Sequence, residues 1–382
     1  MELQTVQENC AVASRQPQSA PLRLVGVQSL RGLAVLMVVI AHLHHTELKY
    51  SLGSHLLGAW TLIGSSGVDI FLVISGFVLT YLGFGHFGTA SYVKSYAFAR
   101  VSRVYPVYIL VTVLLVPLYL LQPALFNTTE GHQVNLWRSL LLIPDLHLPL
   151  IPVAWTLHHE IYFYLVFGAM LLLPERLLIK AMAIWLLITM ALIACGQQTP
   201  RAQQGAFERV LFNPINLEFI LGMVLAYAVV YGPRRGSTKC LWGALLWLCI
   251  ACPVWLAVTG TYGVSDGWRV VVFGLPATLF TYGIVVREIE HGRVFWPRLA
   301  WIGDGAYSIY VTHLMVLVVM GRLWQIFGVP GMVAHLVFLA GSLGASLGLG
   351  YAIYLHVETP MLRWTKRHGP GRARPVLKRA VA

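Results

Sequence analysis

The residues best suited to chemistry in this sequence are ionisable side chains inside long apolar runs, where burial is costly and usually marks a function. The run from 29 to 45, S-L-R-G-L-A-V-L-M-V-V-I-A-H-L-H-H, contains Arg31 and His42. In a helix, eleven residues bring both side chains to one face, about 16 Å apart along the axis. An imidazole can gain or lose a proton near pH 7. The alternative is a histidine at the membrane interface, with Arg31 extended toward lipid headgroups.

Two carboxylates lie in other apolar runs. Asp69 is in G-V-D-I-F-L-V-I-S-G-F, and Glu160 is in A-W-T-L-H-H-E-I-Y-F-Y-L. A carboxylate at membrane depth needs a cation or several hydrogen-bond donors around it. Ser75 and Gly76 are more typical of close helix packing than of a nucleophile. The H-H-E triplet lacks the spacing of a zinc protease, so no metal site is predicted there.

Two further groups of residues are candidates for binding. Arg100 and Arg103, in A-R-V-S-R-V-Y-P, are neighbours on one helix face and suit a phosphate or pyrophosphate. The alternative is an ordinary positive flank at the start of a membrane span. Tyr310 and His313 lie in Y-S-I-Y-V-T-H-L, where a lone histidine is more often a hydrogen-bonded structural residue.

The composition is typical of a membrane protein. Hydrophobic residues make up 57% of the 382 residues and charged residues 11%, against roughly 25% charged in an average soluble domain. Apolar runs of about 20 residues recur, each long enough to cross the hydrocarbon core. We therefore predict an all-α polytopic membrane protein. Its net charge of +12 is explained by cytoplasmic Lys and Arg and requires no nucleic-acid partner. The C-x-x-C at Cys249 and Cys252 is assigned to packing, without a metal.

Ten helical spans and two tails are expected. The spans cover 24–45, 56–83, 104–123, 153–173, 177–195, 213–232, 241–260, 268–287, 304–321 and 331–356. The second should be broken near its glycines. Of the 27 Lys and Arg residues, 20 lie on the side of the termini and 6 on the other, which predicts cytoplasmic termini. The expected units are a cytoplasmic tail, 1–23, which is not a cleavable signal peptide, a membrane domain, 24–360, and a basic tail, 361–382.

Seven segments, in order, resemble the acyltransferase 3 family of integral-membrane O-acyltransferases. Small departures are Phe71-Leu72, where the family often has two Phe, and His158-His159 before the Glu. The segments are L-R-G-L-A-V-L-M-V-V-I-A-H, G-V-D-I-F-L-V-I-S-G-F, R-V-S-R-V-Y-P, W-T-L-H-H-E-I-Y-F-Y, N-L-E-F-I-L-G-M, Y-S-I-Y-V-T-H and V-E-T-P-M-L-R.

The resemblance implies transfer of an acyl group, usually acetyl, from acyl-CoA to a hydroxyl. It implies that His42, which has the spacing from Arg31 that is typical of the family, is essential for catalysis. It also implies that Arg100 and Arg103 bind the acyl donor. On this basis we expect His42 to act as general base or to form an acyl-histidine. We expect Arg31 to contact the acyl donor further into the bundle than Arg100 and Arg103. Asp69 or Glu160 would fix the tautomer of His42.

Acetyl-CoA is the expected co-substrate. The expected acceptor is a cell-surface glycan such as an exopolysaccharide or O-antigen, free or lipid-linked, with substrate contacts from Trp155, Tyr310 and His313. The expected location is the bacterial inner membrane, in contact with its lipids. Alternatives are an acyltransferase for an antibiotic or lipo-oligosaccharide, and a proton-coupled secondary transporter. The oligomeric state stays open.

Overall fold

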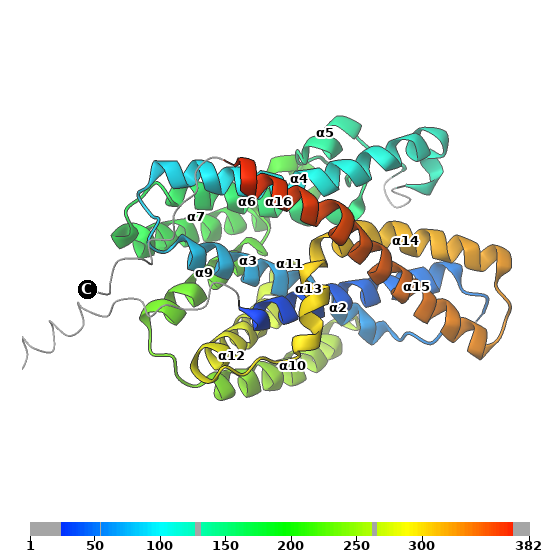
Figure 1. Ribbon diagram of the computed structural model, residues 1–382. Helices are drawn as coiled ribbons and strands as arrows, with labels where there is room; N and C mark the ends of the chain where they lie inside the picture. Colours follow the sequence, from blue (N-terminus) through cyan, green and yellow to red (C-terminus); the bar gives the residue numbers. More distant parts are fainter. Residues whose placement is uncertain (1–23, 54, 127–130, 262–265, 370–382) are drawn as a thin grey trace, which may run out of the picture.

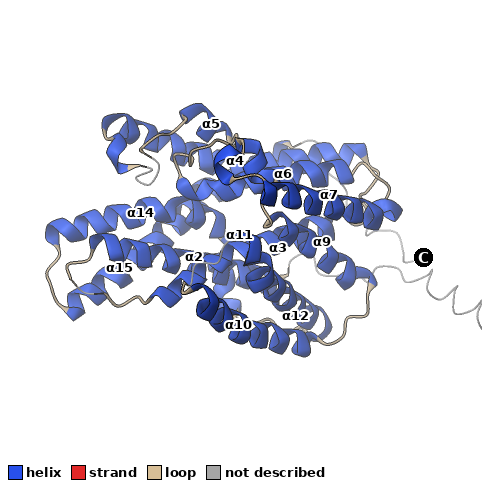
Figure 2. Cartoon of the chain, turned by 180° about the vertical axis from the view of Figure 1, so that it is seen from behind, coloured by secondary structure: helices blue, strands red, loops and turns tan. Residues whose placement is uncertain are grey.

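The computed structural model describes residues 24–53, 55–126, 131–261 and 266–369, and in these ranges all regular structure is helical (Figures 1 and 2). The predicted all-α class is therefore confirmed. The predicted tail 1–23 lies outside the described residues. Of the predicted tail 361–382, only the part within α16 (Thr359–His368) and the residue after it are described.

Ten helices coincide with the ten predicted spans. Eight of them, some extended by a short 3₁₀ or π segment, are long and apolar enough to cross a membrane, so the multi-pass prediction is confirmed. The other two, α6 and α9, have 16 residues each. The ten are α2 (Val25–Tyr50), α3 (Gly67–Gly83), α4 (Ala90–Leu121), α6 (Trp155–Met170), α7 (Leu178–Gln198), α9 (Asn216–Tyr231), α10 (Ser237–Thr259), α12 (Leu275–His291), α14 (Ala306–Phe327) and α15 (Met332–Ile353).

Shorter elements connect and extend these helices. The second span has the expected break, because a 3₁₀ segment, Ala59–Ser66, precedes α3. Two π segments, Val270–Gly274 and Tyr354–Glu358, extend α12 and α15. The short helices are α5 (Leu136–Leu141), α8 (Ala206–Leu211), α11 (Asp266–Arg269) and α13 (Ala300–Asp304), and further 3₁₀ turns are Pro123–Leu125, Pro152–Ala154, Glu175–Leu177, Arg201–Gln203 and Pro297–Leu299.

Helix α2 is the central element of the bundle. It packs against α3, α12, α13, α14 and α15, and the pairs α14–α15 and α10–α12 lie side by side (Figure 1). Helices α3 and α9 approach closely where Gly76 faces Gly222. A Cβ on Gly76 would lie 2.1 Å from the Phe219 carbonyl oxygen, and one on Gly222 2.1 Å from that of Val73. Small residues allow this contact, as predicted for Gly76.

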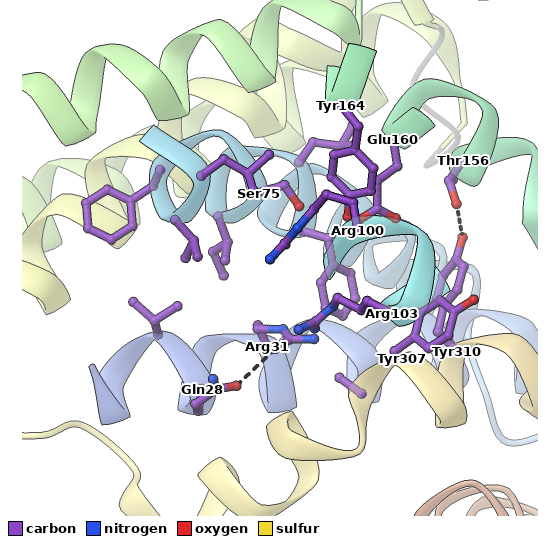
Figure 3. Close-up of a pocket in the computed structure, with 18 of the residues that line it drawn as sticks. Gln28, Arg31, Ser75, Arg100, Arg103, Thr156, Glu160, Tyr164, Tyr307 and Tyr310 are labelled. Carbon is purple, nitrogen blue, oxygen red and sulfur yellow. Dashed lines mark hydrogen bonds between the residues drawn. The ribbon is translucent and has the colours of Figure 1, made fainter. Parts of the chain in front are cut away.

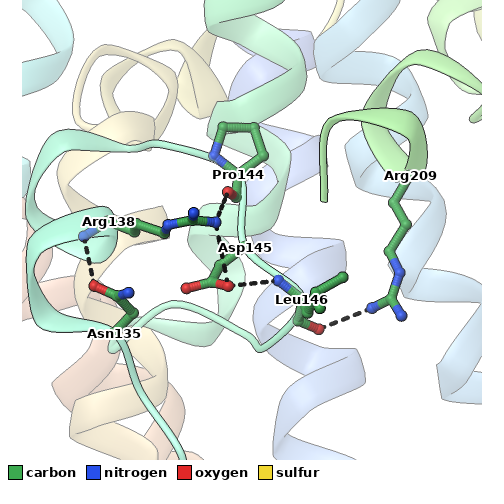
Figure 4. A network of polar contacts seen from close by, with 6 residues as sticks. All are labelled: Asn135, Arg138, Pro144, Asp145, Leu146 and Arg209. Atoms are coloured by element: carbon green, nitrogen blue, oxygen red, sulfur yellow. Dashed lines mark hydrogen bonds and ion pairs between the residues drawn. The ribbon is translucent and has the colours of Figure 1, made fainter. Parts of the chain in front are cut away.

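The proline-rich connection between α4 and α6 is held by a polar network (Figure 4). Arg138 donates to the Pro144 carbonyl at 3.2 Å and lies 3.5 Å from the Asp145 carboxylate. Arg209, between α7 and α9, donates to the Leu146 carbonyl at 2.8 Å. These bonds join two connections at the same end of the bundle.

A buried ion pair joins the start of α3 to α11. Arg269 donates to the two carboxylate oxygens of Asp69 at 2.6 and 3.1 Å, and to the Ser65 carbonyl at 2.8 Å. Asp69 is fully buried, so Arg269 is the cation that the sequence required. Glu218 of α9 is also fully buried and lies beside both residues. The pair therefore ties three helical segments together.

We predict that Arg269→Met lowers the free energy of unfolding by about 3–5 kcal/mol, because it leaves buried carboxylates without a cation. Asp69→Asn should cost less, because Glu218 can replace Asp69 as the partner of Arg269. The measurement is denaturant and thermal unfolding in detergent. The matched control is Arg138→Met, which breaks a half-exposed pair and should cost at most about 1 kcal/mol. Equal losses for Arg269→Met and Arg138→Met would contradict the prediction.

Candidate functional site

A cavity of about 320 Å³ lies among α2, α3, α4, α6 and α14 (Figure 3). It extends from the end where α2 begins and α3 ends, lined by Leu24 and Leu82, to the start of α3, lined by Val68 and Phe71. Toward the first of these ends its wall is apolar, and deeper in the bundle it becomes polar. Its polar lining residues are Gln28, Arg31, Ser75, Tyr81, Arg100, Arg103, Thr156, Glu160, Tyr164, Tyr307 and Tyr310.

Three guanidinium groups converge on this cavity (Figure 3). Arg31 comes from α2, and Arg100 and Arg103 are one turn apart on α4. The sequence predicted both α4 arginines on a flank before the span, but α4 already begins at Ala90. The helix is longer than the predicted span because its first half is polar and has low hydropathy, although part of that half is buried. Tyr96, for example, is buried and donates to the Tyr164 carbonyl at 3.1 Å.

Two carboxylates only partly neutralise the arginines. Glu160 accepts a hydrogen bond from Tyr164, and Glu358, buried, accepts one from Ser308 at 2.6 Å. Both carboxylates interact electrostatically with Arg31 and Arg103. Three guanidiniums against two carboxylates leave an excess positive charge in the cavity.

Arg100 is held differently from the other two arginines. It lies over the rings of Tyr96 and Tyr164, at 5.9 and 5.8 Å, and its buried Nε has no hydrogen-bond partner among the described residues. The planar guanidinium of arginine can donate two parallel hydrogen bonds to a phosphate or a carboxylate. An arginine donor left unsatisfied in a positive cavity therefore suits an anionic ligand.

The deep end of the cavity is closed by Tyr310. Its hydroxyl lies 2.9 Å from that of Thr156 and 3.1 Å from the Val153 carbonyl. Phe71 packs against the Tyr310 ring, with centroids 6.1 Å apart. Tyr307, one turn earlier, donates to the Val104 carbonyl at 2.6 Å. These bonds fix the wall of the cavity where α14 meets α4 and α6.

His42 lies beyond this wall, against α14. Its ring is 5.0 Å from that of His313, and His313 is one turn after Tyr310. The Nδ1 atom of His42 is 2.9 Å from the Val38 carbonyl and 3.3 Å from Nε2 of His313. Because α2 carries both Arg31 and His42, one helix connects the charged cavity with the histidine pair.

The structure brings together most, but not all, of the predicted site residues. Seven are gathered: Arg31, Arg100, Arg103, Glu160 and Tyr310 line the cavity, and His42 and His313 adjoin it. Asp69 is engaged by Arg269, and Trp155 packs edge-on against His159 outside the cavity lining. The expected carboxylate partner of His42 is not found among its contacts in the described chain, where His313 takes that place.

Several site residues were missed by sequence reasoning. Tyr164 follows Glu160 by four residues, Tyr307 precedes Tyr310 by three, and Gln28 precedes Arg31 by three and accepts its hydrogen bond at 3.1 Å. Their helical spacing from identified residues would have placed them on the same faces. Glu358 had no such indication, because its partners Arg31 and Arg103 are far away in sequence. In the described ranges, no group of His, Cys, Asp or Glu is arranged to hold a metal ion.

Comparison with known proteins identifies a family for most of the chain. A family model described as an acyltransferase domain, of the acyltransferase 3 type, matches residues 24–355. The chain is 28% identical over 323 residues to the exopolysaccharide production protein ExoZ of Rhizobium meliloti, covering 82% of this chain and 92% of that protein.

More distant relatives carry acyltransferase names. The peptidoglycan O-acetyltransferase OatA of Listeria monocytogenes is 24% identical, covering 76% of this chain but only 49% of OatA. The acyltransferase MdmB of Streptomyces mycarofaciens is 25% identical, covering 78% of this chain and 80% of MdmB. No solved structure matches the chain. The family match spans most of the chain, including the arginine cavity and the histidine pair, and this protein is therefore an acyltransferase of the acyltransferase 3 family.

Proposed function

We propose that this enzyme transfers an acetyl group from acetyl-CoA to a hydroxyl of a cell-surface glycan. The observation that carries the proposal is the cavity with three arginines, which ends one helical turn from a histidine pair. CoA carries phosphates on a long flexible arm that ends in the thioester. The arginines would bind the phosphates, and the arm would extend past Tyr310 toward His42.

The predicted membrane topology supports entry of the acyl donor from the cytoplasmic side. One end of the cavity lies where α2 begins and α3 ends, and the distribution of Lys and Arg predicts that this side is cytoplasmic. Acyl-CoA is made in the cytoplasm. We therefore propose a bacterial inner-membrane protein with cytoplasmic termini, an inward-facing donor site, and His42 nearer the outer surface where glycans are presented.

In the proposed reaction, His42 takes the proton of the acceptor hydroxyl while the hydroxyl oxygen attacks the carbonyl carbon of the thioester. The C–O bond forms, the C–S bond breaks, and the leaving thiolate of CoA receives a proton. General-base catalysis of this kind contributes about 10²–10⁴-fold. A two-step route through an acyl-histidine uses the same residue and would leave labelled acetyl on the protein after denaturation.

The glycan acceptor is supported by the names of two relatives, an exopolysaccharide production protein and a peptidoglycan O-acetyltransferase. An antibiotic or lipo-oligosaccharide is the alternative acceptor. A secondary transporter is set aside because the family match is to acyltransferases. The test supplies labelled acetyl-CoA to membranes that contain the protein and follows the label into polymer. Label in a small molecule, with none in glycan, would overturn the acceptor assignment.

Arg100→Ala is predicted to raise the KM for acetyl-CoA about tenfold or more, because a charge-assisted hydrogen bond to phosphate contributes about 1.5–3 kcal/mol. Arg100 makes no ion pair within the described residues, so its removal leaves no buried carboxylate unpaired. Arg100→Lys should give an intermediate KM. The measurement is acetyl-CoA binding and steady-state kinetics in detergent. The matched control is Arg293→Ala, an exposed arginine on the same predicted side, and an equal effect there would refute a specific donor site.

His42→Ala is predicted to lower kcat at least about 100-fold while acetyl-CoA binding and thermal stability stay near wild type, because the base acts only in the transition state. The control is His45→Ala, an exposed neighbour on the same helix, which should retain activity. A folded His42→Ala enzyme with wild-type turnover would show that His42 is not the base.

A further inference from the structure

The hydrogen bonds of the two histidines restrict their protonation. Nδ1 of His313 lies 2.7 Å from the Tyr310 carbonyl and 3.3 Å from that of Ile309. A carbonyl oxygen can only accept, so this nitrogen carries a hydrogen. In a neutral imidazole the other nitrogen, Nε2, then has a lone pair. His313 is fully buried in the bundle, and no carboxylate of the described residues is in contact with it. His313 therefore presents an acceptor, rather than a donor, to His42.

The hydrogen bonds of His42 likewise determine which of its two ring nitrogens carries the hydrogen. Its Nδ1 faces the Val38 carbonyl at 2.9 Å and Nε2 of His313 at 3.3 Å, which both accept. The hydrogen must lie on Nδ1, since a lone pair there would face two other lone pairs. Nε2 of His42 is then the basic atom, and no hydrogen bond to it is recorded in the described part of the chain.

We propose that His313 is a positioning residue that, together with the Val38 carbonyl, holds His42 as the Nδ1–H tautomer and leaves Nε2 as the atom that accepts the substrate proton. This inference rests on the proposed function. When the acceptor hydroxyl gives its proton to Nε2 and its oxygen bonds to the acyl carbon, His42 becomes an imidazolium. Its Nδ1–H bond to His313 then becomes charge-assisted and stronger. When the C–S bond breaks, the proton passes to the thiolate sulfur and both rings return to their initial state.

The two carboxylates that the sequence offered as partners of His42 are engaged elsewhere, which leaves this role to a neutral histidine. Asp69 is paired with Arg269, and Glu160 is bonded to Tyr164 in the arginine cavity. Each is held by partners other than His42. His313, by contrast, is fixed on α14 by main-chain carbonyls of its own helix, so its acceptor atom has a defined direction. The pair thus replaces the histidine–carboxylate arrangement of hydrolytic triads, in which the carboxylate orients the base.

The first test is the tautomer of His42 in the wild-type protein. Nitrogen NMR of ¹⁵N-histidine-labelled protein, with His42→Ala for assignment, should show Nδ1 protonated and Nε2 unprotonated at neutral pH. The opposite tautomer, or an even mixture of the two, would overturn the inference. This measurement needs no substrate and no substitution of His313.

The second test compares His313→Phe with His313→Gln. Phe fills the place of the ring without an acceptor, whereas the amide oxygen of Gln can accept near the position of Nε2. We expect His313→Phe to lower kcat about 10–100-fold, with an unchanged KM for acetyl-CoA and a larger share of the Nε2–H tautomer of His42, because the Val38 carbonyl alone would then accept from Nδ1. His313→Gln should recover most of kcat and the single tautomer. The control is His45→Phe, which changes the other ring near His42 and should leave both readouts unchanged.

The outcomes separate this inference from the proposed function. If wild type transfers no acetyl group, or if His42→Ala remains active, the proposed function fails. If His42 is essential but His313→Phe keeps kcat and the single tautomer, only the role of His313 fails. If His313→Phe does not fold, the wild-type tautomer and the activity of His313→Gln still decide the question.

Discussion

Three guanidinium groups share one cavity inside a helical membrane protein, and among the described residues two carboxylates lie close enough to offset them. Such an excess is costly away from water, so the surrounding helices must supply hydrogen bonds, aromatic faces and opposite charge. Tyr164 and Tyr96 under Arg100, and Glu358 near Arg31, meet this requirement. The incomplete neutralisation also favours an anionic ligand, which is the basis for the proposed donor site.

The central position of α2 is related to the charged cavity. One helix carries Arg31 into the cavity and His42 to the histidine pair, so the charged and the reactive positions keep a fixed separation along its axis. Helix α14 repeats this on the facing side, with Tyr310 in the cavity wall and His313 one turn further on. The Asp69–Arg269 pair and the glycine contact between α3 and α9 hold the outer helices around these two.

Much of this arrangement could be predicted from sequence, for identifiable physical reasons. Apolar runs identified ten spans, and helical spacing placed Arg31 with His42, and Arg100 with Arg103. What failed depended on contacts between distant segments. The start of α4 was missed because its first half has low hydropathy and its contacts, such as that of Tyr96 with Tyr164, are made with another helix. Asp69 was expected near His42, but its partner Arg269 is 200 residues away in sequence. Glu358 and the pairing of His42 with His313 likewise arise only when α14 and α15 pack beside α2.

The central claim is that the donor occupies the arginine cavity with its thioester directed toward His42. The most direct measurement is a cryo-electron microscopy structure with an acetyl-CoA analogue in which a methylene group replaces the thioester sulfur. The account predicts phosphate groups against Arg31, Arg100 and Arg103, with the acetyl carbonyl past Tyr310 on the side of the histidine pair. An analogue bound elsewhere on the protein, with this cavity unoccupied, would contradict it.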